Sequence, residues 1–466
     1  MKKIIISFIT LSSIGFNNIS LAQENDLDTY KKVGESVIES YKNKDYRKFS
    51  KDFNKDLSEA LKESKVKQVI DYFKSDLGEI SKVGELIVLD SSTIVYPLTF
   101  AKGSLNLVLS FDKNKKLSGI LFKEPSLLIQ YPKITDKTTI DEIANAYIGH
   151  KENMGLAIGT IDSNGKINEY YYGRKAKNKS KPDSNTLFEI GSITKVFTTT
   201  TFAKMALDKK VNLTDDIDKY TKSPNFENTK IKLQDLATHT SGLPRLPENL
   251  NLDKVDPLNP YSEYTRDEMY KALGDYKLSK KPNTVYEYSN FAMGILGDIL
   301  ATKEKKDYET LIKDEILKPL NMNNTSINLS RTQIFNMATP HDEKGEPVSM
   351  WTFKTLEGAG AIKSNIPDML KFLKSNIYLD NSTLKNSMEL AQETKFKSNV
   401  VEVGLGWHKN KLKSDYLIWH NGGTGGFRSF LGFLKNKKVG VIVLSNSGNG
   451  VDDLSHLILE RLSLDK

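Results

Sequence analysis

The 466-residue sequence contains no cysteine, so disulfide bonds, a thiol nucleophile and a lipid-modified cysteine are all excluded. No glycine-rich segment follows a Walker or dinucleotide-binding pattern. The histidines show no ligand spacing such as His-x-x-x-His; they are His150, His239, His341, His408, His420 and His456. We therefore expect neither a metal nor a cofactor.

Apolar runs long enough to span a membrane are also missing. One shorter run, residues 4–16, follows Met1-Lys2-Lys3 and precedes the small-x-small pattern Ser20-Leu21-Ala22. This order is typical of a secretory signal peptide cleaved after Ala22, with a retained anchor as the alternative. The expectation is an exported protein, periplasmic or secreted, that loses residues 1–22 and keeps no stable membrane span.

Charge of one sign is not concentrated anywhere. The chain has 67 Lys and Arg against 59 Asp and Glu, a net charge of +8, and the two signs are interspersed. Such a pattern indicates a solvated surface, and we expect no nucleic-acid partner. The oligomeric state does not follow from the sequence.

Composition shifts predict three segments after the signal peptide. Residues 25–75 have helical periodicity, and an alternating strand over 104–112 turns into a second strand at 117–122, which together predict a small α+β domain over 25–124. The pattern resembles cone-shaped folds of the nuclear transport factor type. Residues 125–136, with two prolines, read as a linker, and a larger domain covers 137–466.

The larger domain begins and ends with strand patterns around a helical middle. A capping box at Thr139–Glu142 opens a helix, and a hairpin follows at 154–172. Strands return at 416–420, 428–434 and 439–445 before a final helix at about 452–462. This order predicts an antiparallel sheet assembled from both ends of the segment, flanked by helices, beside an all-helical part.

Residues 188–195, Phe-Glu-Ile-Gly-Ser-Ile-Thr-Lys, carry the chemistry. If a helix starts at Ser192, Lys195 lies one turn away on the same face. A hydroxyl needs a nearby base to attack a carbonyl, and an amine can be that base. Ser-x-x-Lys also occurs elsewhere in the chain, and taken alone Ser192 could equally be an ordinary helix N-cap. The buried, threonine-rich helix that follows favours the catalytic interpretation.

Three further segments carry unusual residues, in the order Thr238–Pro244 (THTSGLP), Tyr286–Asn290 (YEYSN) and Trp419–Phe427 (WHNGGTGGF). Separately each has a structural explanation, and for His239 we favour a loop-fixing role. Together with Ser192-x-x-Lys195 they make residues 137–466 resemble the serine β-lactamases and penicillin-binding proteins. The resemblance is strongest to class C β-lactamases, the related D-alanyl-D-alanine carboxypeptidases, and esterases on the same fold.

The resemblance implies acyl transfer through an acyl-enzyme, with Ser192 as nucleophile and Lys195 and Tyr288 sharing the work of the base. It also implies that the backbone N–H groups of Ser192 and Gly423 bind the oxyanion, on a strand whose glycines at 422 and 423 admit the substrate. Asn290 is expected to contact the substrate amide and Lys195.

His420 stands where much of the family has lysine, and it would bind a substrate carboxylate or steer a proton. If it does bind the carboxylate, binding should weaken above neutral pH, because imidazole is only partly charged there.

Three substrate classes remain open on sequence grounds. The leading one is a small-molecule or peptide substrate with an amide carbonyl near a carboxylate, either a β-lactam or a D-Ala-type peptide, including peptidoglycan-derived ones. The second is a simple acyl ester. The third interpretation is a penicillin-binding or sensing protein that is acylated without turnover.

Overall fold

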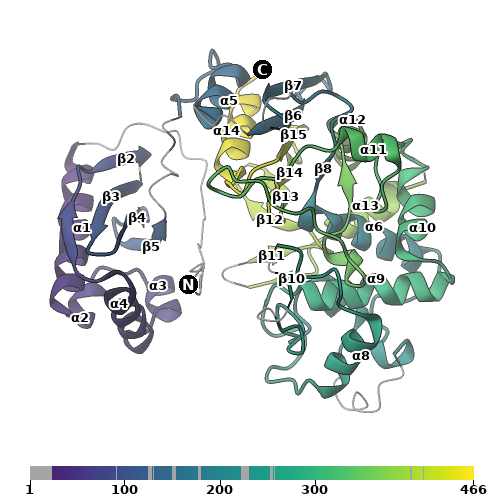
Figure 1. Ribbon diagram of the computed structural model, residues 1–466, viewed down its shortest axis with the longest axis horizontal. Helices are drawn as coiled ribbons and strands as arrows, with labels where there is room; N and C mark the ends of the chain where they lie inside the picture. Colours follow the sequence, from purple (N-terminus) through teal and green to yellow (C-terminus); the bar gives the residue numbers. More distant parts are fainter. Residues whose placement is uncertain are drawn as a thin grey trace. The chain divides into compact units, whose positions relative to one another are not determined.

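The computed structural model in Figure 1 describes residues 24–465 apart from 91, 124–128, 130, 150–153, 177–179, 222–229, 252–254, 257, 382, 399–400 and 413. The chain forms two compact units, residues 1–133 and 134–466. The predicted signal peptide, residues 1–22, lies outside the described residues. Within the described part, no helix combines the length and the apolar character that a membrane crossing requires.

The smaller unit places its helices before its strands, as the sequence pattern predicts. Its helices are α1 (Glu24–Asn43), α2 (Tyr46–Phe49), α3 (Lys55–Ala60) and α4 (Glu63–Leu77), and its strands are β1 (Ile80–Val83), β2 (Ile87–Asp90), β3 (Thr93–Phe100), β4 (Gly103–Phe111) and β5 (Leu117–Lys123). The strands pair antiparallel in the order β1-β3-β4-β5, with β2 also on β3. Residues spaced along one face of α1, such as Val37 and Tyr41, pack with Leu107 and Leu109 in one apolar core.

An eight-stranded antiparallel sheet forms the centre of the larger unit, in the order β10-β11-β12-β13-β14-β15-β6-β7. The strands are β6 (Gly155–Ile161), β7 (Ile167–Gly173), β10 (Phe396–Lys397), β11 (Glu402–Val403), β12 (His408–Lys411), β13 (Tyr416–Gly423), β14 (Arg428–Leu434) and β15 (Val439–Ser445). Because β6 pairs with β15, the sheet is assembled from both ends of the segment, as expected.

Helices cover both faces of this sheet (Figure 1). On one face, the ring of Phe430 in β14 contacts His456 of α14 (Asp452–Ser463), which lies beside α5 (Ile140–Ile148). On the other face, α12 (Ile366–Tyr378) approaches so closely that a Cβ added at Gly440 would lie 2.6 Å from Ile377. The main core of the unit lies on the α12 side.

The remaining helices form the helical part beside the sheet; they are α6 (Thr194–Leu207), α7 (Leu233–Ala237), α8 (Arg266–Asp275), α9 (Asn290–Glu304), α10 (Tyr308–Ile312), α11 (Arg331–Asn336) and α13 (Lys385–Gln392). A short pair of strands, β8 (Phe188–Glu189) and β9 (Lys363–Ser364), leads into α6. The threonines at 198–201 in α6 are fully buried, so this helix is the central one expected behind Ser192. The predicted α+β class with a sheet flanked by helices is confirmed.

Candidate active site

Ser192 lies on a 3₁₀ turn, Gly191–Ile193, between β8 and α6. The helix therefore begins two residues later than the spacing suggested, at Thr194, and its N-cap residue is Ile193. The Ser192 side chain does not cap the helix, so the interpretation as an ordinary N-cap is wrong. Its side chain is partly exposed and lines a cavity.

Lys195 is fully buried in the first turn of α6. Its Nζ lies 2.9 Å from Ser192 Oγ and 2.6 Å from the carbonyl oxygen of Ala359. Burial, reinforced by the charge of Arg245, lowers the pKa of Lys195 well below its ordinary value. This shift favours the neutral amine, which can accept a proton from the hydroxyl that it contacts. The three-residue spacing does bring the two groups together.

The turn that carries Ala359 is held against two helices. An added Cβ at Gly358 would lie 3.0 Å from the carbonyl oxygen of Met293 in α9, so glycine avoids a tight contact there. From α6, Thr198 Oγ1 donates to the carbonyl of Gly358 at 2.8 Å and lies 2.6 Å from the hydroxyl of Tyr308. The resulting contacts fix the acceptor that orients the Lys195 amine.

The ring of Tyr288 lies beside the amine of Lys195 and the guanidinium of Arg245. The Lys195 Nζ is 4.9 Å from its ring centroid, and the guanidinium carbon of Arg245 is 5.1 Å away. Burial raises the pKa of Tyr288, while the neighbouring Ser192 hydroxyl and Arg245 act in the opposite direction. In the free protein this residue is therefore a neutral phenol beside the Ser192–Lys195 pair.

His239 positions the segment that carries Tyr288. Its buried Nδ1 accepts a hydrogen bond from the backbone N–H of Ser289 at 3.1 Å, and its ring lies 4.4 Å from that of Tyr288. The loop-fixing role predicted for His239 is confirmed. Nearby, Asn283 adopts a left-handed φ of 59°, which asparagine tolerates well.

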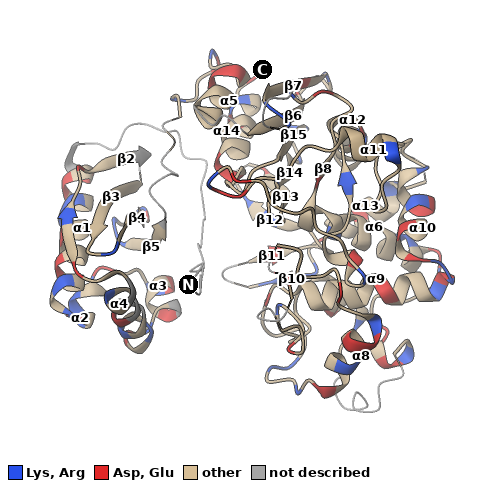
Figure 2. Cartoon of the chain, in the orientation of Figure 1, with Lys and Arg blue, Asp and Glu red and all other residues tan. Residues whose placement is uncertain are grey.

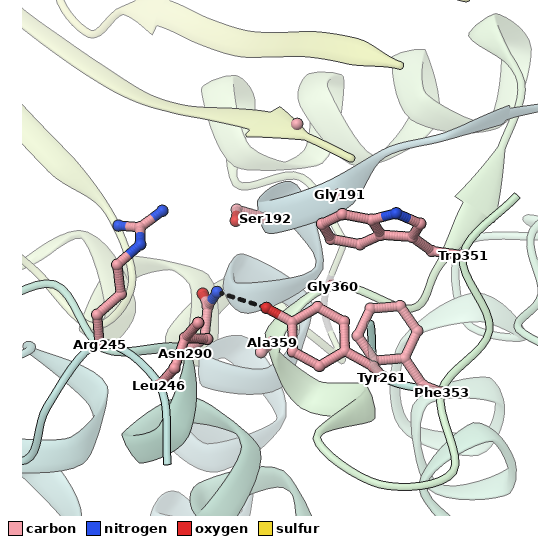
Figure 3. A pocket seen from close by; sticks show the side chains of 11 residues that line it. Gly191, Ser192, Arg245, Leu246, Tyr261, Asn290, Trp351, Phe353, Ala359 and Gly360 are labelled. Carbon is pink, nitrogen blue, oxygen red and sulfur yellow. Dashed lines mark hydrogen bonds between the residues drawn. The ribbon is translucent and has the colours of Figure 1, made fainter. Parts of the chain in front are cut away.

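Asn290 opens α9 and faces the cavity, but it does not contact Lys195 as expected. Its Nδ2 lies 3.4 Å from the hydroxyl of Tyr261, and its buried Oδ1 has no hydrogen-bond partner among the described residues (Figure 3). A buried carbonyl oxygen without a donor suits an N–H group supplied by a substrate. Lys195 is therefore not a hydrogen-bond partner of Asn290, and the Asn290 carbonyl oxygen is available to a ligand.

The two glycines of β13 predicted to admit the substrate differ in exposure: Gly423 faces the cavity, and Gly422 is buried. Gly423 is exposed and lines the cavity, and a Cβ added at Gly191 would lie 2.7 Å from its nitrogen. Gly422 is buried against the serine turn, where an added Cβ would overlap the carbonyl oxygen of Ile190 and lie 3.0 Å from the nitrogen of Ser192. Gly422 is thus a packing position that lets the strand approach the turn.

His420 is fully buried and does not line the cavity. Burial, with smaller effects from His408 and Lys195, lowers its pKa well below the ordinary value, so the ring is neutral at neutral pH. Its Nδ1 lies 2.6 Å from the carbonyl oxygen of Asn421. The expectation that His420 is partly charged near neutral pH is therefore wrong, because burial disfavours the imidazolium.

The cavity at Ser192 has a volume of about 120 Å³. This is enough for the atoms around a scissile bond, so the rest of a larger substrate must extend beyond the cavity. Its lining includes residues that the sequence reasoning missed: Arg245, Leu246, Tyr261, Trp351, Phe353, Ala359 and Gly360. Arg245 directly follows the THTSGLP segment and could have been found there. The aromatic residues come from loops with no motif and gave no local signal. Among the described residues, no group of His, Asp and Glu side chains is arranged to hold a metal ion.

The Beta-lactamase family model matches residues 140–465, and a family described as a protein of unknown function (DUF3887) matches residues 34–120. The D-alanyl-D-alanine-carboxypeptidase/endopeptidase AmpH of Escherichia coli K12 is 28% identical over 353 residues, covering 69% of this chain and 90% of that protein.

Two further matches agree with the family model. A Beta-lactamase of Pseudomonas fluorescens is 25% identical over 349 residues, covering 66% of this chain and 93% of the relative. A solved class C beta-lactamase superposes with a TM-score of 0.63 at 23% identity, over 71% of this chain and 97% of that structure. At this identity the structural match shows a shared fold.

Proposed function

Because this chain belongs to the β-lactamase family, we propose that it is an exported serine hydrolase that works through an acyl-enzyme. The substrates proposed are amides with a nearby carboxylate, either β-lactams or D-Ala-type peptides such as those derived from peptidoglycan. The observation that carries the proposal is the 2.9 Å contact between the buried Lys195 amine and the Ser192 hydroxyl. Export rests on the signal-peptide pattern of residues 1–22.

In the proposed first step, Ser192 Oγ attacks the substrate carbonyl while its proton moves to the neutral Nζ of Lys195. The new C–O bond creates a tetrahedral oxyanion, which the backbone N–H groups of Ser192 and Gly423 bind. The intermediate collapses as the C–N bond breaks, and the leaving amine takes a proton. In this proposal the proton comes from the neutral phenol of Tyr288 or from the newly protonated Lys195, whose Nζ is 4.9 Å from the Tyr288 ring centroid.

In the second step, water attacks the acyl carbonyl and the Ser192 ester bond breaks. The water loses a proton to Lys195 or to a Tyr288 phenolate, and Ser192 Oγ regains one. The depressed pKa of Lys195 and the raised pKa of Tyr288 support the amine as the base that activates Ser192.

Intact-mass analysis tests the proposal directly. Purified protein is incubated with benzylpenicillin and, separately, with an acyl-D-Ala-D-Ala peptide, and the mass is followed over time. We expect an adduct on Ser192 that decays as product appears, and no adduct on Ser192→Ala. A lasting adduct without product would make the chain a penicillin-binding protein, and product formation that is unchanged in Ser192→Ala would refute the serine mechanism.

An esterase is the second candidate, and the neutral, buried His420 favours it. Where the resembling family uses a lysine to hold a carboxylate, this chain offers no charge at that position at neutral pH. Hydrolysis of p-nitrophenyl acetate that depends on Ser192, with no reaction of the penicillin or the peptide, would select this alternative.

A further inference from the structure

Among the described residues that line the cavity at Ser192, Arg245 is the only charged one. Figure 3 shows its guanidinium extending into the same space that Ser192 faces. The side chain is exposed, whereas the Lys195 amine is fully buried and already occupied by Ser192 and Ala359. Any anionic part of a ligand in this cavity therefore meets Arg245 as its cation.

The backbone of Arg245 is fixed while its side chain is uncommitted. Its carbonyl oxygen accepts hydrogen bonds from the N–H groups of Asn290 at 2.9 Å and Phe291 at 3.3 Å, at the start of α9. No carboxylate within the described ranges pairs with the guanidinium, which instead lies over the Tyr288 ring. A guanidinium that lies over an aromatic face keeps its five N–H donors available, because they point outward in the plane of the guanidinium itself.

The opposite wall of the cavity is aromatic and carries no charge. Tyr261 stacks on Phe353 with ring centroids 4.9 Å apart and meets the Trp351 ring edge-on at 5.2 Å. Figure 3 shows these three rings across the cavity from Arg245, with Ser192 and Asn290 between them. The cavity is thus polarised: an apolar group of a substrate suits one side, and an anionic group suits the other.

We infer that Arg245 binds an anionic group of the substrate and makes the enzyme prefer acyl donors that carry one on the Arg245 side of the scissile carbonyl. This inference rests on the proposed function and assigns to Arg245 the role that the sequence had given to His420. Loss of one charge-assisted hydrogen bond at a partly exposed site should reduce the preference by roughly tenfold.

Matched ester pairs measure this preference. One pair places the charge in the acyl group: the p-nitrophenyl esters of glutaric acid and of its monomethyl ester. The other places it in the leaving group: hippuryl 3-hydroxybenzoate and its methyl ester. For each pair, the readout is kcat/KM for the anionic ester divided by kcat/KM for the neutral ester. This ratio is determined for the native chain, Arg245→Gln, Arg245→Lys and Arg331→Gln. Arg331→Gln is the control, because it removes an exposed arginine on α11 outside the cavity. Because Arg245 also acts on Tyr288, the ratio rather than either rate is the readout.

We expect at least one pair to show a preference for the anion that falls with rising salt. It should drop about tenfold in Arg245→Gln, be partly kept in Arg245→Lys and be unchanged in Arg331→Gln. The inference is overturned if neither pair shows a preference, or if the preference survives Arg245→Gln. Ser192→Ala separates this outcome from a failure of the proposed function: ester turnover that persists without Ser192 refutes the serine mechanism, whatever the ratio.

Discussion

Replacing Gly422 by alanine tests how closely strand β13 must approach the nucleophile. The added methyl group would overlap the carbonyl oxygen of Ile190 and the hydroxyl of Ser429, which are joined by a hydrogen bond of 2.8 Å. Losing that bond costs about 1 kcal/mol, and overpacking a buried site costs a further ~1–3 kcal/mol. We expect Gly422→Ala to lower the free energy of unfolding of the larger unit by about 2–4 kcal/mol.

The same change should reduce catalysis, because the backbone that must move carries Gly423. Displacing one oxyanion donor typically costs 10²- to 10³-fold in rate. Urea unfolding and kcat/KM for p-nitrophenyl acetate measure the two effects. Gly423→Ala is the matched control on the same strand, since the contacts of its added methyl group are with the Arg428 side chain, at 3.2 Å or more, and not with backbone. The reasoning would be refuted if Gly422→Ala lost less than ~1 kcal/mol of unfolding free energy and kept near-native activity. It would also be refuted if Gly423→Ala lost more unfolding free energy than Gly422→Ala.

Three other predictions concern charge and the loop of Tyr288. Because the Arg245 charge lowers the pKa of Lys195, Arg245→Gln should shift the acid limb of the pH–kcat/KM profile to higher pH, and an unshifted limb would contradict this. Burial lowers the pKa of His408 to about 4, so between pH 6.5 and 4 the unfolded chain binds more protons than the folded one. The stability that neutral His408 contributes above pH 6.5 should therefore be lost over that range, an effect of about 3 kcal/mol. Urea unfolding at each pH measures the loss, and it should be smaller in His408→Gln. His239→Ala leaves the buried N–H of Ser289 without its acceptor and should cost ~1–3 kcal/mol, with reduced ester turnover; native stability and native turnover in this variant would argue against the loop-fixing role.

Much of the fold could be predicted because its signals are local. The capping box at Thr139 is present with both hydrogen bonds, and strands β14 and β15 have the predicted bounds. The hairpin at 154–172 turns through Gly165 at a φ of 80°, as its turn sequence suggested. Such features depend on residues a few positions apart, so periodicity and turn chemistry are enough to find them.

The pairing of Ser192 with Lys195 could also be predicted from the sequence, because a spacing of three residues along a helical turn brings the two side chains together. The carbonyl of Ala359, by contrast, reaches Lys195 across 164 positions of sequence, on a turn that packs closely on α9 at Gly358. No local pattern encodes that approach.

By itself the sequence determined the order of elements, the family and the residues able to do acyl-transfer chemistry. Only the tertiary structure decided which of those residues carry charge and which face a ligand. His420 and Arg245 show the difference: burial among other basic groups leaves His420 neutral and away from the cavity, while Arg245 stays exposed beside Ser192. The physical reason is that ionisation and accessibility depend on solvent and on distant neighbours, and chain folding alone sets both.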